Sequence, residues 1–166
     1  LLAAAVLALS DDEVAAALVL AQTERMDFFV GLRVDIAKMY LEAVADCEYL
    51  VPQAVPEGYQ STWWSFACRY ERDDVSWPDF CKKYMEFGGD GVYAAWALLY
   101  DETIYASGDW RKHCPAIYDG LPDQRGSCPN ADRLQPKIMQ FVNNYGSTEE
   151  AEQQTVALAK TIAHFA

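Results

Sequence analysis

The stretch SWPDFCKKYMEFGGDG, from Ser76 to Gly91, contains both ends of one helix and decides how the flanking sequence is divided. Ser76 can cap the helix, because its hydroxyl accepts a hydrogen bond from a free backbone N–H of the first turn. Pro78 lies in that same turn, where its missing N–H costs little. Gly88 and Gly89 end the helix, since glycine tolerates positive φ. The apolar face consists of Phe80, Tyr84 and Phe87.

Two strand-like runs precede this helix. The first, Glu48 to Val55, is closed by a turn signal, Pro56-Glu57-Gly58. The second, Ser61 to Glu71, alternates with the period of two that a strand requires. Its faces are Trp64, Phe66, Cys68 and Tyr70 on one side and Trp63, Ser65, Ala67 and Arg69 on the other. Both faces carry apolar side chains, so we expect both to be partly covered.

A long amphipathic helix is predicted upstream of the strands. Ser10-Asp11-Asp12-Glu13 forms a capping box, which predicts a helix start at Ser10. Apolar residues then keep close to a 3.6-residue period, and we expect the helix to end around Asp46 with a bend near Thr23 or Gly31. This length is typical of a connection between two bodies. We therefore divide the chain into a linking helix or helix pair, residues 1–46, and a small α+β domain, residues 47–166.

The sequence after the glycines predicts mostly loop, then a strand and a last helix. Residues 91–105 are apolar and aromatic without a clear period, and residues 106–129 are rich in loop-forming Pro and Gly. A short helix is predicted at 131–135 and a strand at 138–142. A second capping box, Ser147 to Glu150, opens the final helix. Its expected inward face is Val156, Ala159, Ile162 and Ala163. The fold class is α+β, with a small, mostly antiparallel sheet covered by helices on one side.

The composition is that of one soluble globular domain. Of the 166 residues, 52% are apolar and 23% are charged, and 25 acidic against 13 basic side chains give a net charge of −12. Phosphates of a nucleic acid would be repelled, so no nucleic-acid partner is expected. The apolar run Leu1 to Leu9 is too short to span a membrane, so no membrane association is expected, and we interpret it as a buried helix or a cut edge. Five cysteines, an odd number, favour reduced thiols and a cytoplasmic location.

Three segments in the right order carry a family resemblance. The double-glycine loop runs into Tyr93-Ala-Ala-Trp-Ala-Leu-Leu-Tyr100, and a later segment reads Cys128-Pro-Asn-Ala-Asp-Arg-Leu-Gln-Pro-Lys-Ile-Met-Gln-Phe141. The stretch Glu13 to Gln22 resembles a helix of the type E-[LI]-x-A-A-x-x-x-x-Q, with Val14 at the second position. Together these segments resemble the C-terminal domain of the DegT/DnrJ/EryC1/StrS sugar aminotransferases, the small domain of a fold-type-I transferase.

The resemblance implies an enzyme that uses pyridoxal 5'-phosphate, forms a homodimer and transfers an amino group from a donor, usually glutamate, to a nucleotide-linked keto sugar. In relatives the cofactor lysine, the carboxylate at the pyridine nitrogen and the stacking aromatic group all come from the preceding domain. Their Asn-Tyr-Arg segment, whose asparagine reaches the cofactor phosphate, is replaced here by Ala8-Leu9-Ser10. No lysine of this chain lies in the family's S-x-x-K segment. We therefore predict no cofactor-binding residue and no catalytic residue, and no catalysis by this chain alone.

The expected substrate-binding residues are Tyr93, Trp96 and Tyr100. Relatives place a histidine and a tyrosine near the sugar or its phosphates in the loop after Gly91, and Ala95 and Trp96 stand at the corresponding positions here. Tyrosine and tryptophan can stack on a sugar or base and donate one hydrogen bond. The competing interpretation is that these aromatic residues simply pack a small core.

Other chemistry has weaker support. His113 and Cys114 together with Cys128 suggest zinc, but the spacing lacks a C-x-x-C or H-x-x-x-H pair and a fourth ligand, so no metal site is predicted. An alternative function is a non-catalytic module that grips a carbohydrate or a protein through Trp63-Trp64 and Tyr93 to Tyr100. A third is a secreted protein in which four cysteines form disulfides. If the domain belongs to a larger enzyme, Val14 to Ala21 should expose an apolar stripe.

Overall fold

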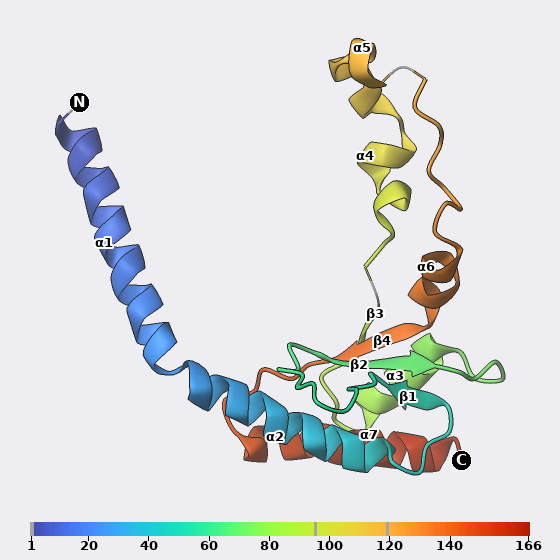
Figure 1. The fold of residues 1–166 in the computed structure, drawn as a ribbon. Helices are drawn as coiled ribbons and strands as arrows, with labels where there is room; N and C mark the ends of the chain where they lie inside the picture. Colours follow the sequence, from blue (N-terminus) through green and yellow to red (C-terminus); the bar gives the residue numbers. More distant parts are fainter. Residues whose placement is uncertain (1, 95, 119) are drawn as a thin grey trace.

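The computed structural model describes residues 2–94, 96–118 and 120–166 (Figure 1). A four-stranded antiparallel sheet in the order β1-β2-β4-β3 forms the body together with helices α2, α3 and α7. Two segments extend away from this body: α1, and an arm between β3 and β4 that comprises residues 96–118 and 120–134 (Figure 1). The strands are β1 Leu50–Pro52, β2 Phe66–Tyr70, β3 Tyr93–Ala94 and β4 Ile138–Phe141. The α-helices are α1 Leu2–Glu24, α2 Met26–Val44, α3 Trp77–Glu86, α4 Thr103–Ala106, α5 Pro115–Tyr118, α6 Pro129–Leu134 and α7 Thr148–His164, with 3-10 turns η1 Leu99–Asp101, η2 Asp109–His113 and η3 Gln135–Lys137.

The predicted long helix is two helices that meet at Arg25. The bend near Thr23 is confirmed, whereas Gly31 lies inside α2. The predicted start at Ser10 is wrong, because α1 already runs from Leu2. Alanine and leucine have the strongest helix propensities, so the run before Ser10 continues the helix instead of ending it. No helix within the described residues is both long and apolar enough to cross a membrane.

Both upstream strands are shorter than the sequence predicts. β1 keeps three residues and β2 keeps five. Trp63 explains the late start of β2, since its φ of +51° lies in the left-handed region and interrupts the extended backbone. Because of this turn, the two tryptophans before the strand face the opposite way from the prediction: Trp63 is buried and Trp64 is exposed. Within β2 the prediction is confirmed, because Phe66, Cys68 and Tyr70 all face the core.

The core lies between one face of the sheet and the helices that cover it (Figure 1). The Tyr40 ring of α2 stacks on Phe66 of β2 with centroids 4.9 Å apart, and its hydroxyl donates to the Val142 carbonyl oxygen at 3.0 Å. Tyr84 of α3 packs edge-on against Phe141 of β4 at 5.5 Å. These contacts confirm the α+β class with helices on one side, and every strand pair is antiparallel.

The double glycine after α3 is required by close packing. Gly88 has φ of +96°, and its carbonyl oxygen accepts from Gln153 Nε2 at 2.9 Å. A Cβ at Gly89 would lie 2.4 Å from ring atoms of Tyr84, which is itself 1% exposed. A side chain at either position therefore conflicts with the backbone conformation or with the buried ring.

Both serine caps are confirmed, but the predicted inward face of α7 is wrong except at Ile162, which packs against the core. Ser76 accepts from the Asp79 N–H and Ser147 accepts from the Glu150 N–H. The Glu150 carboxylate reaches back to the Gly146 N–H at 2.9 Å, one residue before the cap. The face that α7 buries consists of Ala151, Gln154, Thr155, Ala157, Leu158 and Thr161. Val156, Ala159 and Ala163, which we expected to face inward, are exposed. The prediction failed because hydrogen-bonded polar side chains form part of the buried face, so this face does not appear in the sequence as a row of apolar residues.

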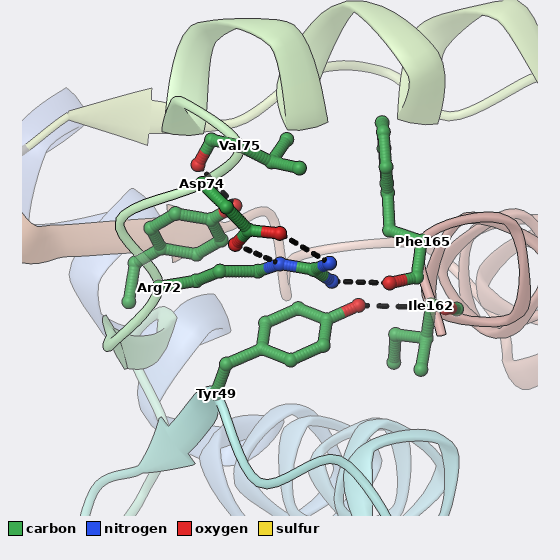
Figure 2. Close-up of polar contacts among 7 residues, drawn as sticks. Tyr49, Arg72, Asp74, Val75, Ile162 and Phe165 are labelled. Carbon is green, nitrogen blue, oxygen red and sulfur yellow. Dashed lines mark hydrogen bonds and ion pairs between the residues drawn. The ribbon is translucent and has the colours of Figure 1, made fainter.

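The C-terminal end of α7 is held by Arg72, which precedes α3 (Figure 2). Its guanidinium donates to the Phe165 carbonyl oxygen and forms a two-point ion pair with Asp74, with Nε to Oδ1 at 2.5 Å and Nη2 to Oδ2 at 2.9 Å. The guanidinium also lies over the Tyr49 ring at 4.9 Å, and the Tyr49 hydroxyl donates to the Ile162 carbonyl oxygen at 3.4 Å. A cation beside free carbonyls is favourable at the negative end of a helix dipole. Arg72 thus connects α7 to the turn before β1 and to the loop before α3.

We predict that Gly89→Ala destabilises the body, because the added methyl group must displace a buried ring that is also hydrogen bonded. Overpacking of this kind costs about 1–3 kcal/mol, which should lower the thermal midpoint by roughly 2–10 °C. Gly31→Ala is the matched control: nothing lies within 4 Å of its Cβ, and alanine favours a helix interior. Equal midpoints for the two variants in a circular dichroism melt would contradict the prediction.

We predict that Asp74→Asn lowers the thermal midpoint at pH 7 and has little effect near pH 2. The Arg72 guanidinium lowers the pKa of Asp74 below its ordinary value of 3.8. A lowered native pKa means that the stabilisation is present above 3.8 and is lost as the pH falls through the native pKa. Asp73→Asn removes the same charge from a residue that forms no ion pair with the described residues. If the thermal midpoint of D74N stays as far below that of the parent at pH 2 as at pH 7, the ion pair with Arg72 is not the cause of the difference.

Candidate functional site

Tyr93 lies on the face of the sheet that the helices leave open. It pairs with Gln140 across β3 and β4, and Gln140 pairs with Ala67 across β4 and β2. Directly opposed residues share a face, and Ala67 alternates with the core residues of β2, so all three side chains belong to the open face. Tyr93 is 62% exposed.

Trp96 is the first described residue after β3 and is 79% exposed. Its ring packs edge-on against Trp64 at a centroid distance of 6.4 Å, and Trp64 is itself 66% exposed. The Trp96 carbonyl oxygen accepts from Gln135 Nε2 at 3.4 Å. Two large aromatic side chains from distant parts of the sequence thus form an exposed pair beside the start of the arm.

Tyr100 is engaged within the arm. Its hydroxyl donates to Asp132 Oδ1 of α6 at 2.5 Å, and this carboxylate raises the pKa of Tyr100 to about 12. The phenol is therefore protonated at neutral pH, and its one donor hydrogen is used. Tyr100 connects the outgoing part of the arm to α6, and only its ring and its remaining lone pair are left for a ligand.

The predicted substrate residues therefore have three separate surroundings. Tyr93 contacts β4, Trp96 contacts Trp64, and Tyr100 contacts α6. The interpretation that they pack the core is wrong for Tyr93 and Trp96, which face solvent. Their role in substrate binding stays a prediction. Ala95, the other position that the resemblance singled out, lies outside the described residues.

A partly open cavity of about 670 Å³ lies between the outgoing part of the arm and its return toward α6. Its aromatic and charged lining consists of Tyr100, Tyr105, Trp110, Arg111, Asp123 and Arg125. Sequence reasoning missed Arg111 and Arg125 because they belong to a loop-rich segment without a motif. The signal that could have found Arg111 is the density of aromatic and basic residues from Tyr105 to Tyr118.

A second, wider groove of about 1070 Å³ lies at the elbow where α1 meets α2. Leu18, Met26 and Phe28 line it, and each is more than half exposed. Val14 and Val19 add further exposed apolar surface on α1. The expected exposure of the Val14 to Ala21 segment is confirmed.

The lysines of this chain do not fit a pyridoxal 5'-phosphate site. Four of the six form surface ion pairs at 2.5–2.8 Å: Lys38 with Asp35, Lys83 with Glu86, Lys112 with Asp109 and Lys137 with Glu71. Lys82 and Lys160 are exposed on helices. An amine that forms a Schiff base must be uncharged near neutral pH, which requires burial or a nearby cation. No chemical step through the cofactor can be assigned to these residues.

The cysteines and histidines likewise form no recognisable centre. All five cysteines are free thiols, and burial raises the pKa of Cys68 to about 12, so that this thiol stays protonated. His164 packs against Phe165 and Phe87 at the end of α7. Among the described residues, no group of three or more His, Cys, Asp or Glu side chains is arranged to hold a metal ion.

Comparison with known proteins agrees with the fold. A sequence profile described as the DegT/DnrJ/EryC1/StrS aminotransferase family matches residues 11–159. No curated protein matches the chain significantly.

Two solved structures illustrate the similarity of fold. An aminotransferase, TlmJ, from Streptoalloteichus hindustanus matches with a TM-score of 0.68 at 19% identity, over 92% of this chain and 37% of that protein. PseC of Helicobacter pylori, an aminotransferase involved in the biosynthesis of pseudoaminic acid, matches with a TM-score of 0.67 at 14% identity, over 92% and 38%.

A third structure has a different activity. GDP-4-keto-6-deoxy-D-mannose-3-dehydratase of E. coli, solved with hydrated PLP, matches with a TM-score of 0.56 at 18% identity, over 84% of this chain and 33% of that protein. This chain therefore spans about a third of the length of the solved structures it matches.

Proposed function

This chain belongs to the DegT/DnrJ/EryC1/StrS aminotransferase family, and on that basis we propose that it is the C-terminal part of a pyridoxal-phosphate-dependent enzyme. The proposed reaction is transfer of an amino group from a donor to a nucleotide-linked keto sugar. The family match over residues 11–159 carries the proposal. Two further observations support it: this chain shares its fold with solved aminotransferases, and it covers only 37% and 38% of their length.

In this proposal the cofactor is held by residues outside this chain. The support is chemical: the six lysines are either ion paired or exposed on helices, so none has the surroundings of a Schiff-base amine. The chain alone would then be inactive. Its division into a linking segment, residues 1–46, and a small domain, residues 47–166, remains part of the proposal, with the second half of α2 packed into the domain core.

The open side of the sheet would form one wall of the substrate cleft. Tyr93 and Trp96 offer exposed rings that can stack on a sugar or a base, and Tyr100 places the start of the arm through its bond to Asp132. The elbow groove and the exposed residues of α1 would be covered by the cofactor-binding domain or by the second subunit of a homodimer, because apolar surface of this size is seldom left in water.

A second candidate is the non-catalytic binding module, which the exposed Trp64–Trp96 pair favours. Exposed tryptophans are common at sites that bind flat ligands or protein partners. The two candidates differ in whether any longer form of the protein forms an aldimine with pyridoxal phosphate.

We predict that the gene encodes the missing cofactor lysine upstream of Leu1, and that the longer product shows aldimine absorbance with added pyridoxal phosphate. It should transfer the amino group of a donor such as glutamate to a nucleotide-linked keto sugar, and the 166-residue chain should do neither. Spectrophotometry and mass spectrometry of the sugar product measure both activities. A stop codon immediately upstream of Leu1, or a longer product that forms no aldimine, would overturn the enzyme proposal and leave the binding module.

We predict that Trp96→Ala in the longer enzyme raises KM for the nucleotide sugar about tenfold, which corresponds to about 1.4 kcal/mol, with kcat changed less than threefold. A stacking surface that binds substrate and transition state alike affects KM and leaves kcat nearly unchanged. Tyr59→Ala is the control, since Tyr59 is a comparably exposed aromatic residue (76%) in the loop between β1 and β2. Equal KM values for the two variants would exclude Trp96 from the substrate site.

A further inference from the structure

The cavity in the arm has the size of a small-molecule site. It occupies about 670 Å³ between the segment from Leu99 to Arg111 and the returning segment from Leu121 to Cys128. Natural ligand sites commonly measure about 300–1,000 Å³ and combine apolar walls with a few placed polar groups. Figure 1 shows the arm standing clear of the sheet, so this cavity is separate from the open face that carries Tyr93.

Arg111 is fixed in the lining of this cavity without a direct ion pair, although its charge helps to lower the pKa of Asp123, which lines the same cavity. Its guanidinium lies over the Trp110 ring at 4.8 Å, and Nη1 donates to the Tyr118 carbonyl oxygen at 3.0 Å. None of the carboxylates in the described part of the chain lies within ion-pair distance of it. A guanidinium that is already held in place loses little entropy when it binds a planar or tetrahedral anion.

The neighbouring cations contrast with Arg111. Arg125 is bound by the Asp123 carboxylate, with Nε to Oδ2 at 2.8 Å, and Lys112 is paired with Asp109 at 2.6 Å. The carboxylates of Asp123 and Asp109 therefore form their ion pairs with Arg125 and Lys112, and not with Arg111. In a chain of net charge −12, a half-buried arginine left with unused donors beside a cavity indicates an anionic ligand.

The wall beside Arg111 is aromatic. Tyr105 and Trp110 pack with centroids 5.9 Å apart, and Trp110 packs edge-on against Tyr118 at 4.8 Å. Tyr105, Trp110 and the ring of Tyr100 all line the cavity, together with Leu99 and Leu121. Such a wall suits a flat ring, since aromatic pairs favour offset or edge-on contact.

We propose that the arm cavity binds a nucleoside diphosphate, with the phosphate on Arg111 and the base against the wall of Tyr105 and Trp110. The choice of a nucleotide among aromatic anions rests on the proposed function, in which the substrate is a nucleotide-linked sugar. The open face would then receive the sugar portion and the arm the nucleotide portion. An aromatic carboxylate has related chemistry and is separated from a nucleotide by the experiment.

The experiment is calorimetric titration of the 166-residue chain with UDP, dTDP and GDP, and separately with uridine, pyrophosphate and benzoate. At least one diphosphate should bind, and uridine and pyrophosphate should each bind at least tenfold more weakly than that nucleotide. Arg111→Met keeps the stem over Trp110 and removes the guanidinium, so it should raise Kd about ten- to a hundredfold. Lys112→Met removes the same charge one residue away from an 80% exposed side chain and should change Kd less than twofold.

Several outcomes overturn the proposal. These are no binding of any diphosphate, equal loss of affinity in both variants, pyrophosphate binding as tightly as the nucleotides, or benzoate competing with equal affinity. Arg111→Lys guards against misfolding, since it keeps the charge but loses the planar fork, and its Kd should lie between those of the parent and R111M. If R111M has a lower thermal midpoint than K112M, only the Arg111→Lys variant is used to test the contact. A Kd of R111K equal to that of the parent would then refute the guanidinium contact.

The proposed function and this inference can fail independently. Aldimine formation and amino transfer by the longer enzyme, with nucleotide binding indifferent to Arg111, would refute only the site in the arm. Arg111-dependent binding of a diphosphate, with no aldimine in any longer form, would refute only the aminotransferase proposal.

Discussion

One buried acceptor, the side-chain oxygen of Gln154, fixes the junction from which the arm leaves the body. The Tyr84 hydroxyl donates to this oxygen at 2.8 Å, and the Asp90 backbone N–H donates to the same atom at 2.8 Å. Gln154 is 4% exposed and Tyr84 is 1% exposed, so a Tyr84 hydroxyl that lost this acceptor would stay buried without it, at a cost of about 1–3 kcal/mol. A single atom of α7 therefore holds both the end of α3 and the glycine loop.

The arm depends on this junction because β3 itself is only two residues long. A strand of that length adds few ladder hydrogen bonds, so the direction of the chain after Gly91 has to be set by the loop before it. Tyr145 contributes by donating to Asp90 Oδ2 at 2.8 Å. Burial raises the pKa of Tyr84 and of Tyr145, which keeps both phenols protonated as donors. The direction in which the chain leaves α3 thus depends on the side chains of Gln154 and Tyr145.

Local signals in the sequence were sufficient for the elements but not for the contacts between them. The caps at Ser76 and Ser147 and the glycine stop at Gly88 could be predicted because each acts within one helical turn. The left-handed Trp63 could not, since its conformation is stabilised by tertiary packing and no glycine or asparagine marks it.

The dependence on contacts between distant residues also explains why the buried face of α7 and the role of Arg111 were not predicted. The inward face of α7 includes Gln154 and Thr161, whose burial is possible only because specific acceptors and donors meet them. The exposed residues Tyr93 and Trp96 were found through the family resemblance, whereas Arg111 was missed. Its placement depends on Trp110 and on a carbonyl seven residues away, which no motif records.

The elbow between α1 and α2 separates two different physical situations. Ile36, Tyr40 and Val44 of α2 are buried against the sheet and α7, and Arg72 closes the far end of the body. On α1, by contrast, Val14 and Leu18 are 60% and 61% exposed, and the apolar residues show almost no preferred side. A helix that is apolar all round is normally buried all round. None of the described core residues belongs to α1, so the core does not cover the exposed apolar side chains of this helix.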